Sequence, residues 1–275
     1  MASIATTHKV FLLGATGGIG SQVLKRLLDR GCKVTIIVRN TERLSTEMKD
    51  HPSLTVIEEP SGHLSLTDET FQKHVQCDAI VQCLGHNLSF KGLFGHPRRL
   101  CADTVKRLCD AVMVVAPRNP IKLIVINTEG VERPDGEDRK TLRRGCCESC
   151  VLCFLKYCLP PHADNIDTSV YLHNEVQNNP YVDFCAVRPT DLIDGLPTEF
   201  TVHETLQNGI FNSGTTLRSN VGEFMANLVT DSGVWNKWKN TYPHILDVKT
   251  AEHDHRGGTT NSNTADDAGN EKKDR

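Results

Sequence analysis

The sequence predicts an α/β protein with a doubly wound parallel sheet, and two observations support this prediction. Short runs rich in valine, isoleucine and leucine alternate with longer segments in which apolar residues recur every three to four positions, which is the pattern of serial βαβ units. The short runs are almost continuously apolar, as expected of strands that helices cover on both faces. A chain of 275 residues has room for one large domain of this kind or for two small ones.

The expected elements follow one another in chain order. A helical pair is expected at about 145–178, a sixth strand at 182–189 and a helix at about 219–230, with a looser connection between the last two. Before them we expect strands at 8–15, 33–39, 54–59, 78–85 and 121–127, and helices at 21–31, 40–50, 66–75 and 97–112.

These elements predict a single Rossmann-like domain over residues 8–248, with a small substrate-side region toward its C-terminal end. Residues 1–7 are expected to be flexible. The stretch 249–275 contains no aromatic and almost no apolar side chains. It cannot bury enough surface to offset the entropy of ordering, so we expect a disordered polar tail.

The composition argues against several classes of function. A formal net charge of −3 provides no broad basic field, so nucleic-acid binding is not expected. No apolar run approaches the roughly 18 residues that a membrane helix requires. The N-terminus lacks the pattern of a secretory signal, so we expect a cytoplasmic protein that does not associate with membranes. Its 11 cysteines are then expected to be reduced thiols rather than disulfides.

Four glycines lie in the stretch GATGGIG, between the first expected strand and the first expected helix. Gly14 permits a sharp turn, Gly17 allows a pyrophosphate to approach the backbone, and Gly20 permits close packing of the helix. The helix that begins near Gly18 would direct its free N–H groups and its positive dipole end at the phosphates. A glycine turn that serves only packing is the alternative. We expect a dinucleotide-binding turn made of Gly14, Thr16, Gly17, Gly18, Ile19 and Gly20.

The end of the second expected strand indicates which dinucleotide is bound. A site specific for NAD usually has an Asp or Glu there to bind the ribose hydroxyls, whereas a site for NADP supplies a cation for the 2′-phosphate. This chain has Arg39 followed by Asn40 at that place. A guanidinium can bind a phosphate through paired hydrogen bonds, so the sequence favours NADP over NAD. The alternative is that Arg39 is a solvated surface arginine.

The stretches GATGGIG, IIVRN and VRPTDLIDG together resemble the atypical short-chain dehydrogenase/reductases. More narrowly, the chain is similar to the NAD(P)H-binding group that includes NmrA-like proteins and biliverdin-reductase-B-like flavin reductases. The resemblance runs from about Val10 to about Asp247 and includes CLGHN (83–87), LPPHADN (159–165) and LRSNVGEFM (217–225).

The resemblance also implies further site residues at the carboxyl ends of the strands, where ligands bind in open α/β sheets. Leu84, Gly85 and His86 lie in the turn at the carboxyl end of the fourth expected strand and should lie beside the cofactor. By the same resemblance, the nicotinamide should be flanked by Asn127, Thr128, Pro189 and Thr190.

The chain departs from the typical dehydrogenases of this superfamily in one respect. Those enzymes use a Tyr-x-x-x-Lys pair, in which the lysine lowers the tyrosine pKa so that the phenol can exchange a proton with the substrate. No tyrosine here has a lysine four residues later. The remaining catalytic candidates are His86, which could donate a proton near neutral pH, and Thr128, which stands near the place of the family's active-site serine. His86 could equally be a structural histidine bonded to loop backbone.

Three further polar candidates have both functional and structural interpretations. His162 and Asp164 could form an oriented acid at the pocket entrance, or Asp164 could simply cap the helix that follows it. Glu175 is either a solvated helix residue or a pocket carboxylate.

Five cysteines lie in one expected helical segment, and their spacing is close to that of some metal ligands. The residues between them are helix-forming and apolar, so small thiols on a buried helix face are the plainer interpretation, with metal binding and a redox-active pair as alternatives. They are Cys146, Cys147, Cys150, Cys153 and Cys158.

The primary functional hypothesis is an NADP(H)-dependent reductase acting on a small organic acceptor that needs little acid catalysis, such as a flavin, a quinone or a conjugated carbonyl. The rival hypothesis is a non-catalytic dinucleotide sensor of the NmrA-like kind, which would report redox state to a protein partner, since fold alone does not imply catalysis. No metal is expected, and the sequence leaves the oligomeric state open.

Overall fold

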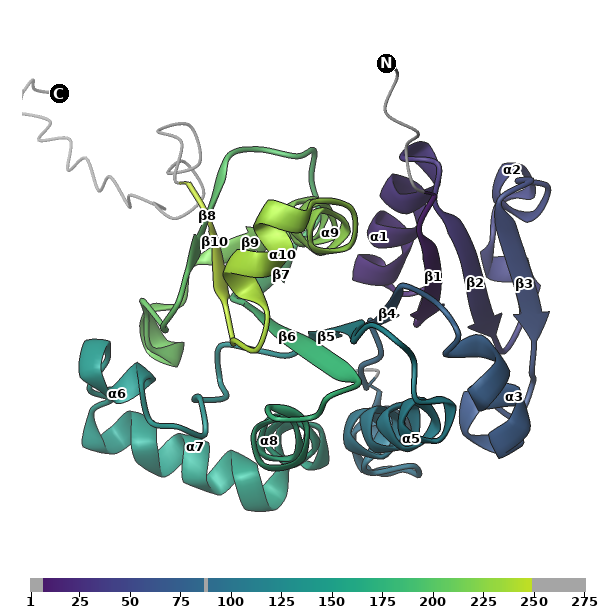
Figure 1. Ribbon diagram of the computed structural model, residues 1–275. Coiled ribbons are helices and arrows are strands. Elements are labelled where there is room, and N and C mark those ends of the chain that lie inside the picture. The colour runs from purple at the N-terminus through teal and green to yellow at the C-terminus, as the bar shows by residue number, and fades with distance from the viewer. Residues whose placement is uncertain (1–6, 87–88, 249–275) are drawn as a thin grey trace, which may run out of the picture.

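The computed structural model describes residues 7–86 and 89–248 and contains an eight-stranded sheet (Figure 1). Seven of its strands run parallel, and the last strand, at one edge, pairs antiparallel with its neighbour. In spatial order the strands are β3 (Leu54–Glu58), β2 (Lys33–Val38), β1 (Lys9–Leu13), β4 (Ala79–Gln82), β5 (Ile121–Ile126), β6 (Val182–Pro189), β10 (His244–Asp247) and β8 (Phe200–His203).

Helices cover both faces of this sheet, as Figure 1 shows. One face carries α1 (Gly18–Asp29), α9 (Arg218–Thr230) and α10 (Ser232–Trp238). The opposite face carries α3 (Asp68–His74), α5 (Leu100–Val115) and α8 (Pro160–Tyr171), the last continued by a π-helical turn at Leu172–Val176.

The central strand β1 explains why the expected strands read as continuous apolar runs. Val10 and Leu12 pack into the core beneath α1 and α9, whereas Phe11 and Leu13 pack into the core beneath α3 and α5. Successive side chains of a strand point to opposite faces, so a strand between two helical layers needs an apolar residue at every position. The Rossmann-like doubly wound fold is confirmed.

The six expected strands of the first two thirds of the chain are confirmed, but the region after Pro189 contains more structure than the sequence predicted. The expected loose connection holds β7 (Asp191–Ile193), β8 and β9 (Thr215–Leu217), with β7 and β9 paired in a separate two-stranded sheet. Beyond the expected helix at about 219–230 the chain forms α10 and then β10. These strands have only three or four residues each, too few to show a clear alternation.

Four further helices complete the described part of the chain, and one of them, α7 (Cys146–Cys158), forms with α8 the helical pair expected at about 145–178. The helix predicted at 40–50 is wrong: the segment forms only a 3-10 turn (Thr41–Arg43) and α2 (Thr46–Lys49). The other three are α4 (Phe90–Phe94), α6 (Asp138–Thr141) and α7. The predicted polar tail at 249–275, and all but Thr7 of the predicted flexible N-terminus, lie outside the described residues.

A buried ion pair joins β6 to α6. Arg188 is fully buried, and its Nη1 and Nη2 donate to the two carboxylate oxygens of Asp138 at 2.5 and 3.1 Å. The same carboxylate accepts the backbone N–H groups of Arg133 and Leu206. Burial by itself would raise the pKa of Asp138, but its hydrogen bonds and the charge of Arg188 outweigh burial and hold that pKa below its ordinary value.

Candidate functional site

The turn between β1 and α1 has the geometry of a phosphate-binding loop. Gly14 has a φ of +80°, which favours glycine, and its carbonyl oxygen accepts the N–H of Gly17 at 3.0 Å. A Cβ atom on Gly20 would lie only 2.1 Å from that same carbonyl oxygen. The turn therefore closes tightly and requires glycine at both of its ends.

This turn leaves the amino end of α1 open. The capping position, Gly17, provides no side-chain hydrogen bond to the first turn of the helix. Gly18 is exposed, and Thr16 and Ile19 are half-buried. Because the first N–H groups of a helix have no partner within the helix, they remain available to an anion here.

The carboxyl end of β4 lies directly against the turn. A Cβ atom on Gly14 would be 2.5 Å from the carbonyl oxygen of Cys83 and 3.0 Å from the backbone nitrogen of Leu84. The structure therefore places Leu84 and Gly85 beside the glycine turn, between β1 and β4, where the order of the strands in the sheet reverses. This is the position at which doubly wound sheets bind ligands.

Arg39 and Asn40 are exposed at the carboxyl end of β2. The Asn40 side chain accepts the N–H of Glu42 at 2.7 Å and donates to its carboxylate at 2.9 Å. Over the described ranges 7–86 and 89–248, the Arg39 guanidinium has neither a hydrogen-bond nor an ion-pair partner. A second exposed cation, Arg43, follows one turn later, and the sequence analysis did not single it out.

Side chains at the ends of β5 and β6 hold neighbouring elements together. Asn127 is buried, and its amide donates to the carbonyl of Asn165 and the hydroxyl of Ser169, both on α8. The Thr190 hydroxyl, which follows Pro189 at the end of β6, bonds the Thr216 hydroxyl at 2.6 Å. The carboxyl ends of β5 and β6 lie on the same side of the sheet as the glycine turn, because these strands run parallel to β1. We call this side, formed by the carboxyl ends of the strands, the rim.

His86 is held at both of its ring nitrogens. Nδ1 lies 3.2 Å from the carbonyl oxygen of Gly92, and Nε2 lies 2.8 Å from Oδ2 of Asp164. The protein therefore occupies both ring nitrogens, and neither is free to donate to a substrate in this geometry. The histidine joins the loop after β4 to α8.

The predicted pairing of His162 with Asp164 is wrong, as is the prediction that Asp164 caps the helix that follows it. Asp164 lies within α8 and is almost fully buried. Its carboxylate accepts the backbone N–H groups of Cys101 and Ala102 at 2.8 and 2.9 Å, so it caps α5, a helix that precedes it in the chain. Asp164 and His86 are 78 residues apart, and no local pattern could have paired them.

Among the described residues, one group of three side chains has ligand atoms close enough to hold a metal ion: His86, Cys101 and Asp164, within 4.8 Å of one another. Both carboxylate oxygens already accept hydrogen bonds, from the ring of His86 and from the first turn of α5. The thiol of Cys101 is buried, and burial raises its pKa. These hydrogen bonds account for the arrangement without an ion.

Thr128 and His162 both border Gly130, which follows β5. A Cβ atom on Gly130 would lie 3.3 Å from Cε1 of His162 and 3.8 Å from Oγ1 of Thr128. Burial lowers the pKa of His162, and the charge of Arg144 lowers it further, so the imidazole is neutral at pH 7. The rim therefore presents a hydroxyl and a neutral imidazole close together.

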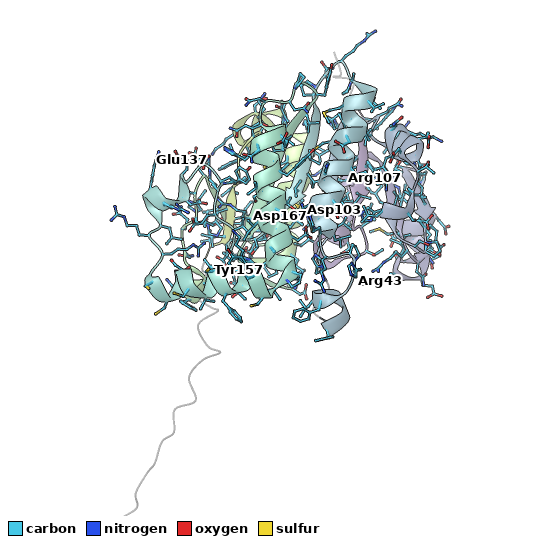
Figure 2. The ribbon with its side chains drawn as sticks, turned by 90° about the horizontal axis from the view of Figure 1, so that it is seen from below. Arg43, Asp103, Arg107, Glu137, Tyr157 and Asp167 are labelled. Carbon is cyan, nitrogen blue, oxygen red and sulfur yellow. The ribbon has the colours of Figure 1, made fainter. Side chains whose placement is uncertain are left out.

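The prediction that the cysteine cluster lies on a buried helix face is wrong. Of the 13 residues of α7, only Glu148 is buried, because this helix packs on the molecule along a single narrow face. Figure 2 shows α7 at the edge of the molecule, with Tyr157 labelled on it. Glu175, in the π-helical turn that continues α8, is exposed as well. All five clustered cysteines are exposed: Cys146, Cys147, Cys150, Cys153 and Cys158.

We expect the 11 cysteines to react with an aromatic disulfide reagent in two classes. The five exposed thiols on α7 should react quickly, and the other six should react slowly. Burial raises the pKa values of Cys77, Cys83 and Cys109 to about 12, and the thiolate is the reactive form. The measurement is the rate of chromophore release, with all 11 thiols reacting in denaturant as the control. A single class of 11 equal thiols would contradict the position of α7.

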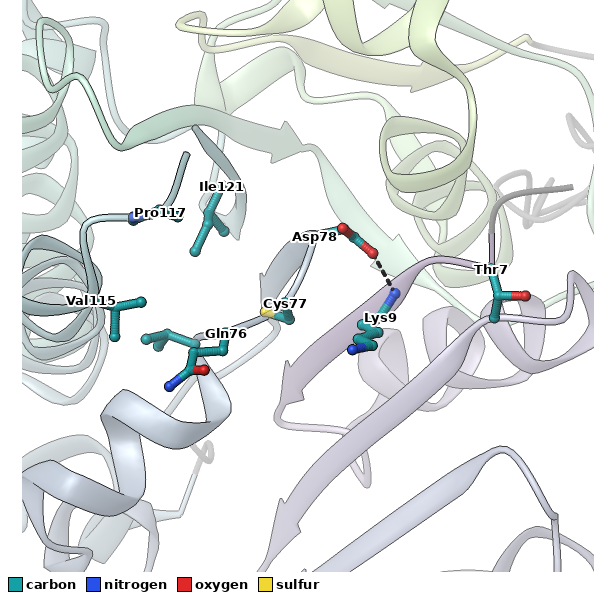
Figure 3. Close-up of a pocket in the computed structure, with 9 residues that line it drawn as sticks. Thr7, Lys9, Gln76, Cys77, Asp78, Val115, Pro117 and Ile121 are labelled. Carbon is teal, nitrogen blue, oxygen red and sulfur yellow. Dashed lines mark hydrogen bonds between the residues drawn. The ribbon is translucent and has the colours of Figure 1, made fainter. Parts of the chain in front are cut away.

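A pocket of about 460 Å³ lies at the opposite edge of the sheet from the glycine turn (Figure 3). It is lined by residues at the amino ends of strands, including Lys9, Asp78 and Ile121. The Asp78 carboxylate accepts the backbone N–H of Lys9 at 2.7 Å. The carboxylate of Asp78 is therefore already bonded to the first residue of β1, and we interpret this pocket as a structural feature of the amino ends of the strands.

Within the part of the chain that the structure describes, no helix is both long enough and apolar enough to cross a membrane.

Comparisons with known sequences point to a nicotinamide-binding family. The sequence model of a family described as NAD(P)H-binding matches residues 14–232, which include the glycine turn and the ends of the strands described above. An uncharacterised chloroplastic protein of Arabidopsis thaliana is 45% identical over 51 residues, a match that spans 18% of this chain and 18% of the relative.

Several solved structures share the fold. A protein from Lactobacillus casei superposes with a TM-score of 0.61 at 18% identity, covering 88% of this chain and 100% of that one. The oxidoreductase YlbE of Lactococcus lactis gives 0.60 at 16% identity, covering 88% and 92%. The anaerobillin reductase ChuY of Escherichia coli gives 0.59 at 16% identity, covering 88% and 100%.

Proposed function

The chain belongs to the NAD(P)H-binding family, and from this premise we propose that it is an NADP(H)-dependent reductase that passes hydride to a small organic acceptor. The observation that carries the proposal is the glycine turn at the carboxyl edge of the sheet. The turn is closed at Gly14 and Gly20, and the helix behind it has no side-chain cap. Such a turn suits a pyrophosphate, because it offers free N–H donors and no Cβ atoms.

The preference for NADP rests on the cations at the end of β2. Arg39 follows the last residue of the strand, where a carboxylate would bind the ribose hydroxyls of NAD, and Arg43 lies one turn further on. A guanidinium without a protein partner is available to form paired, charge-assisted hydrogen bonds with a 2′-phosphate. We assign that role to Arg39, with Arg43 adding positive charge beside it.

The nicotinamide end of the cofactor would then lie along the rim formed by the ends of β4, β5 and β6, where a reduced nicotinamide supplies hydride to the acceptor. Leu84 and Gly85 would form one wall. Thr128 would donate a hydrogen bond to the acceptor, and neutral His162 lies next to it at Gly130. The proton that completes the reduction would come from solvent, or from His86 if its contact with Asp164 opens.

The missing Tyr-x-x-x-Lys pair narrows the class of acceptor. Without a phenol of lowered pKa, the site lacks the proton donor that reduction of an isolated ketone requires. A flavin, a quinone or a conjugated carbonyl needs less help, because the charge that hydride delivers is delocalised. The test is the loss of NADPH absorbance with one acceptor from each of these classes. Binding of NADPH without oxidation by any of them would contradict the enzyme proposal.

Replacing Arg39 with aspartate should weaken NADPH binding by on the order of 2 kcal/mol, about 30-fold, and leave NADH binding nearly unchanged. The change removes a charge-assisted pair and adds repulsion toward the 2′-phosphate. The measurement is a fluorescence titration with each cofactor. The matched control is Arg118→Asp, which makes the same charge change at an exposed position near the amino end of β5. Equal losses for NADPH and NADH would mean that Arg39 does not contact the 2′-phosphate.

The alternative function, a dinucleotide sensor, is favoured by the engagement of both ring nitrogens of His86 with protein acceptors. A sensor must distinguish the oxidised from the reduced cofactor, whereas an enzyme must turn one into the other. Unequal affinities for NADP⁺ and NADPH, with no turnover in the acceptor panel, would select the sensor.

A further inference from the structure

Helices α1 and α9 pack side by side (Figure 1), and the first residue of α1, Gly18, lies against the first residue of α9, Arg218, so the amino ends of the two helices lie together. A Cβ atom on Gly222 would lie 2.6 Å from the Cβ of Gln22, so the two backbones approach closely one turn after each helix begins. Further along, Arg26 pairs with Glu223 at 2.9 Å. The contacts advance together along both helices.

The side chain of Arg218, the first residue of α9, lies across the glycine turn. Its Cδ and Nε would be 2.8 and 3.0 Å from a Cβ atom on Gly18, the first residue of α1. This contact exists only because Gly18 has no side chain. It places the central carbon of the guanidinium, Cζ, 4.0 Å from the same Cβ position, beside the first turn of α1.

The ion pair of Arg218 is one that a ligand can replace. Its Nη1 lies 2.9 Å from Oδ1 of Asp194, whose side chain is 87% exposed. An ion pair whose carboxylate is this exposed contributes little to stability, because water competes for both charges. An anion held by two helix ends would compete for the same guanidinium on favourable terms.

At the amino end of α9 the N–H of Leu217 donates to Oδ2 of Asp247 at 2.7 Å, but another donor in the first turn has no partner within the described chain. The capping position of α9, Leu217, provides no side-chain hydrogen bond. The Ser219 hydroxyl in its first turn is buried, and among residues 7–86 and 89–248 it has no hydrogen-bond partner. A buried hydroxyl without a partner is unfavourable, so the Ser219 hydroxyl would gain from a polar partner that the described residues do not supply.

We propose that Arg218 and the amino end of α9 form the second wall of the pyrophosphate subsite, opposite the glycine turn. The pyrophosphate of the dinucleotide would bind between the amino ends of α1 and α9, and Arg218 would exchange Asp194 for a phosphate oxygen. The inference rests on the proposed dinucleotide binding and adds a binding residue some 200 positions away from the glycine turn. Arg218 would bind the pyrophosphate, which NADPH and NADH share, whereas Arg39 would bind the 2′-phosphate, which only NADPH carries.

The test is a titration of the full chain and its Arg218→Met variant with NADPH and, separately, with NADH. Methionine keeps an unbranched stem over Gly18 and removes the charge. The variant should bind both cofactors roughly 10- to 100-fold more weakly, by the same factor for each. Arg218→Lys should recover part of the loss, and Asp194→Asn should not weaken either cofactor. Arg118→Met, at the opposite edge of the sheet, is the matched control, and an unchanged melting temperature shows that each variant is folded.

The outcomes separate this inference from the function on which it rests. A wild-type protein that binds neither dinucleotide overturns the proposed function and this inference with it. A wild-type protein that binds, together with an Arg218→Met variant that binds equally well, overturns the inference alone. A loss confined to NADPH also overturns it, because that result would place Arg218 at the 2′-phosphate.

Discussion

Replacing Asp138 with asparagine is expected to lower the free energy of unfolding by about 3–5 kcal/mol. The substitution leaves the fully buried guanidinium of Arg188 without its countercharge, in a place that water cannot reach. It also replaces one of the two oxygens that accept the backbone N–H groups of Arg133 and Leu206. The measurement is the midpoint of urea unfolding at neutral pH.

The control for this experiment is Asp103→Asn, which makes the same chemical change in an exposed ion pair. Asp103 lies 3.4 Å from Arg99, and the side chains of both are more than half exposed, so its loss should cost less than about 1 kcal/mol. Equal effects of the two substitutions would mean that the buried pair between β6 and α6 contributes no more to stability than an exposed pair does.

The same pair makes stability depend on pH on the acid side. The pKa of Asp138 is lower in the folded protein than in the unfolded chain, because the hydrogen bonds and charge of Arg188 outweigh the effect of burial. Its stabilising contribution is therefore present above the unfolded pKa and is lost as the pH falls through the folded pKa. The Asp138→Asn variant should lack this part of the acid-induced loss of stability.

Replacing Gly20 with alanine is expected to weaken dinucleotide binding by roughly 10- to 100-fold, the loss of one or two charge-assisted hydrogen bonds. The new Cβ atom would lie 2.1 Å from the carbonyl oxygen of Gly14, so the turn must open and the first N–H groups of α1 must move. Crowding of this kind also costs stability, about 1–3 kcal/mol. The measurement is a cofactor titration at a temperature at which the variant is folded.

The matched control is Gly145→Ala. Gly145 precedes α7 with a φ of −65°, and a Cβ atom there would meet no other atom within 4 Å. This variant should bind the cofactor as the wild type does. If Gly20→Ala also bound it normally, the glycine turn would not be the phosphate site.

The sequence was a good guide wherever a feature depends on neighbouring residues. The first six strands of the central sheet along the chain and the glycine turn are such features, because a few consecutive residues determine the hydrophobic periodicity and the need for glycine. The sixth strand, Val182–Pro189, was predicted with its exact bounds. The short strands after it were missed, since three or four residues carry too little pattern.

The parts that could not be predicted depend on contacts between distant segments. Arg218 reaches Gly18 because α9 packs along α1, and His86 meets Asp164 because α8 lies against the start of α5. For the cysteines of α7 the sequence pattern led to a wrong prediction. Their apolar, helix-forming sequence predicts burial, but the helix has no neighbour on its cysteine-bearing side among the described residues.

Binding of a nicotinamide dinucleotide is the central claim, and calorimetric titration of the purified protein with NADPH and separately with NADH tests it most directly. We predict that both bind, that NADPH binds more tightly, and that Arg39→Asp removes the difference. Absence of heat and of saturation with either cofactor, from a protein shown to be folded, would contradict the claim.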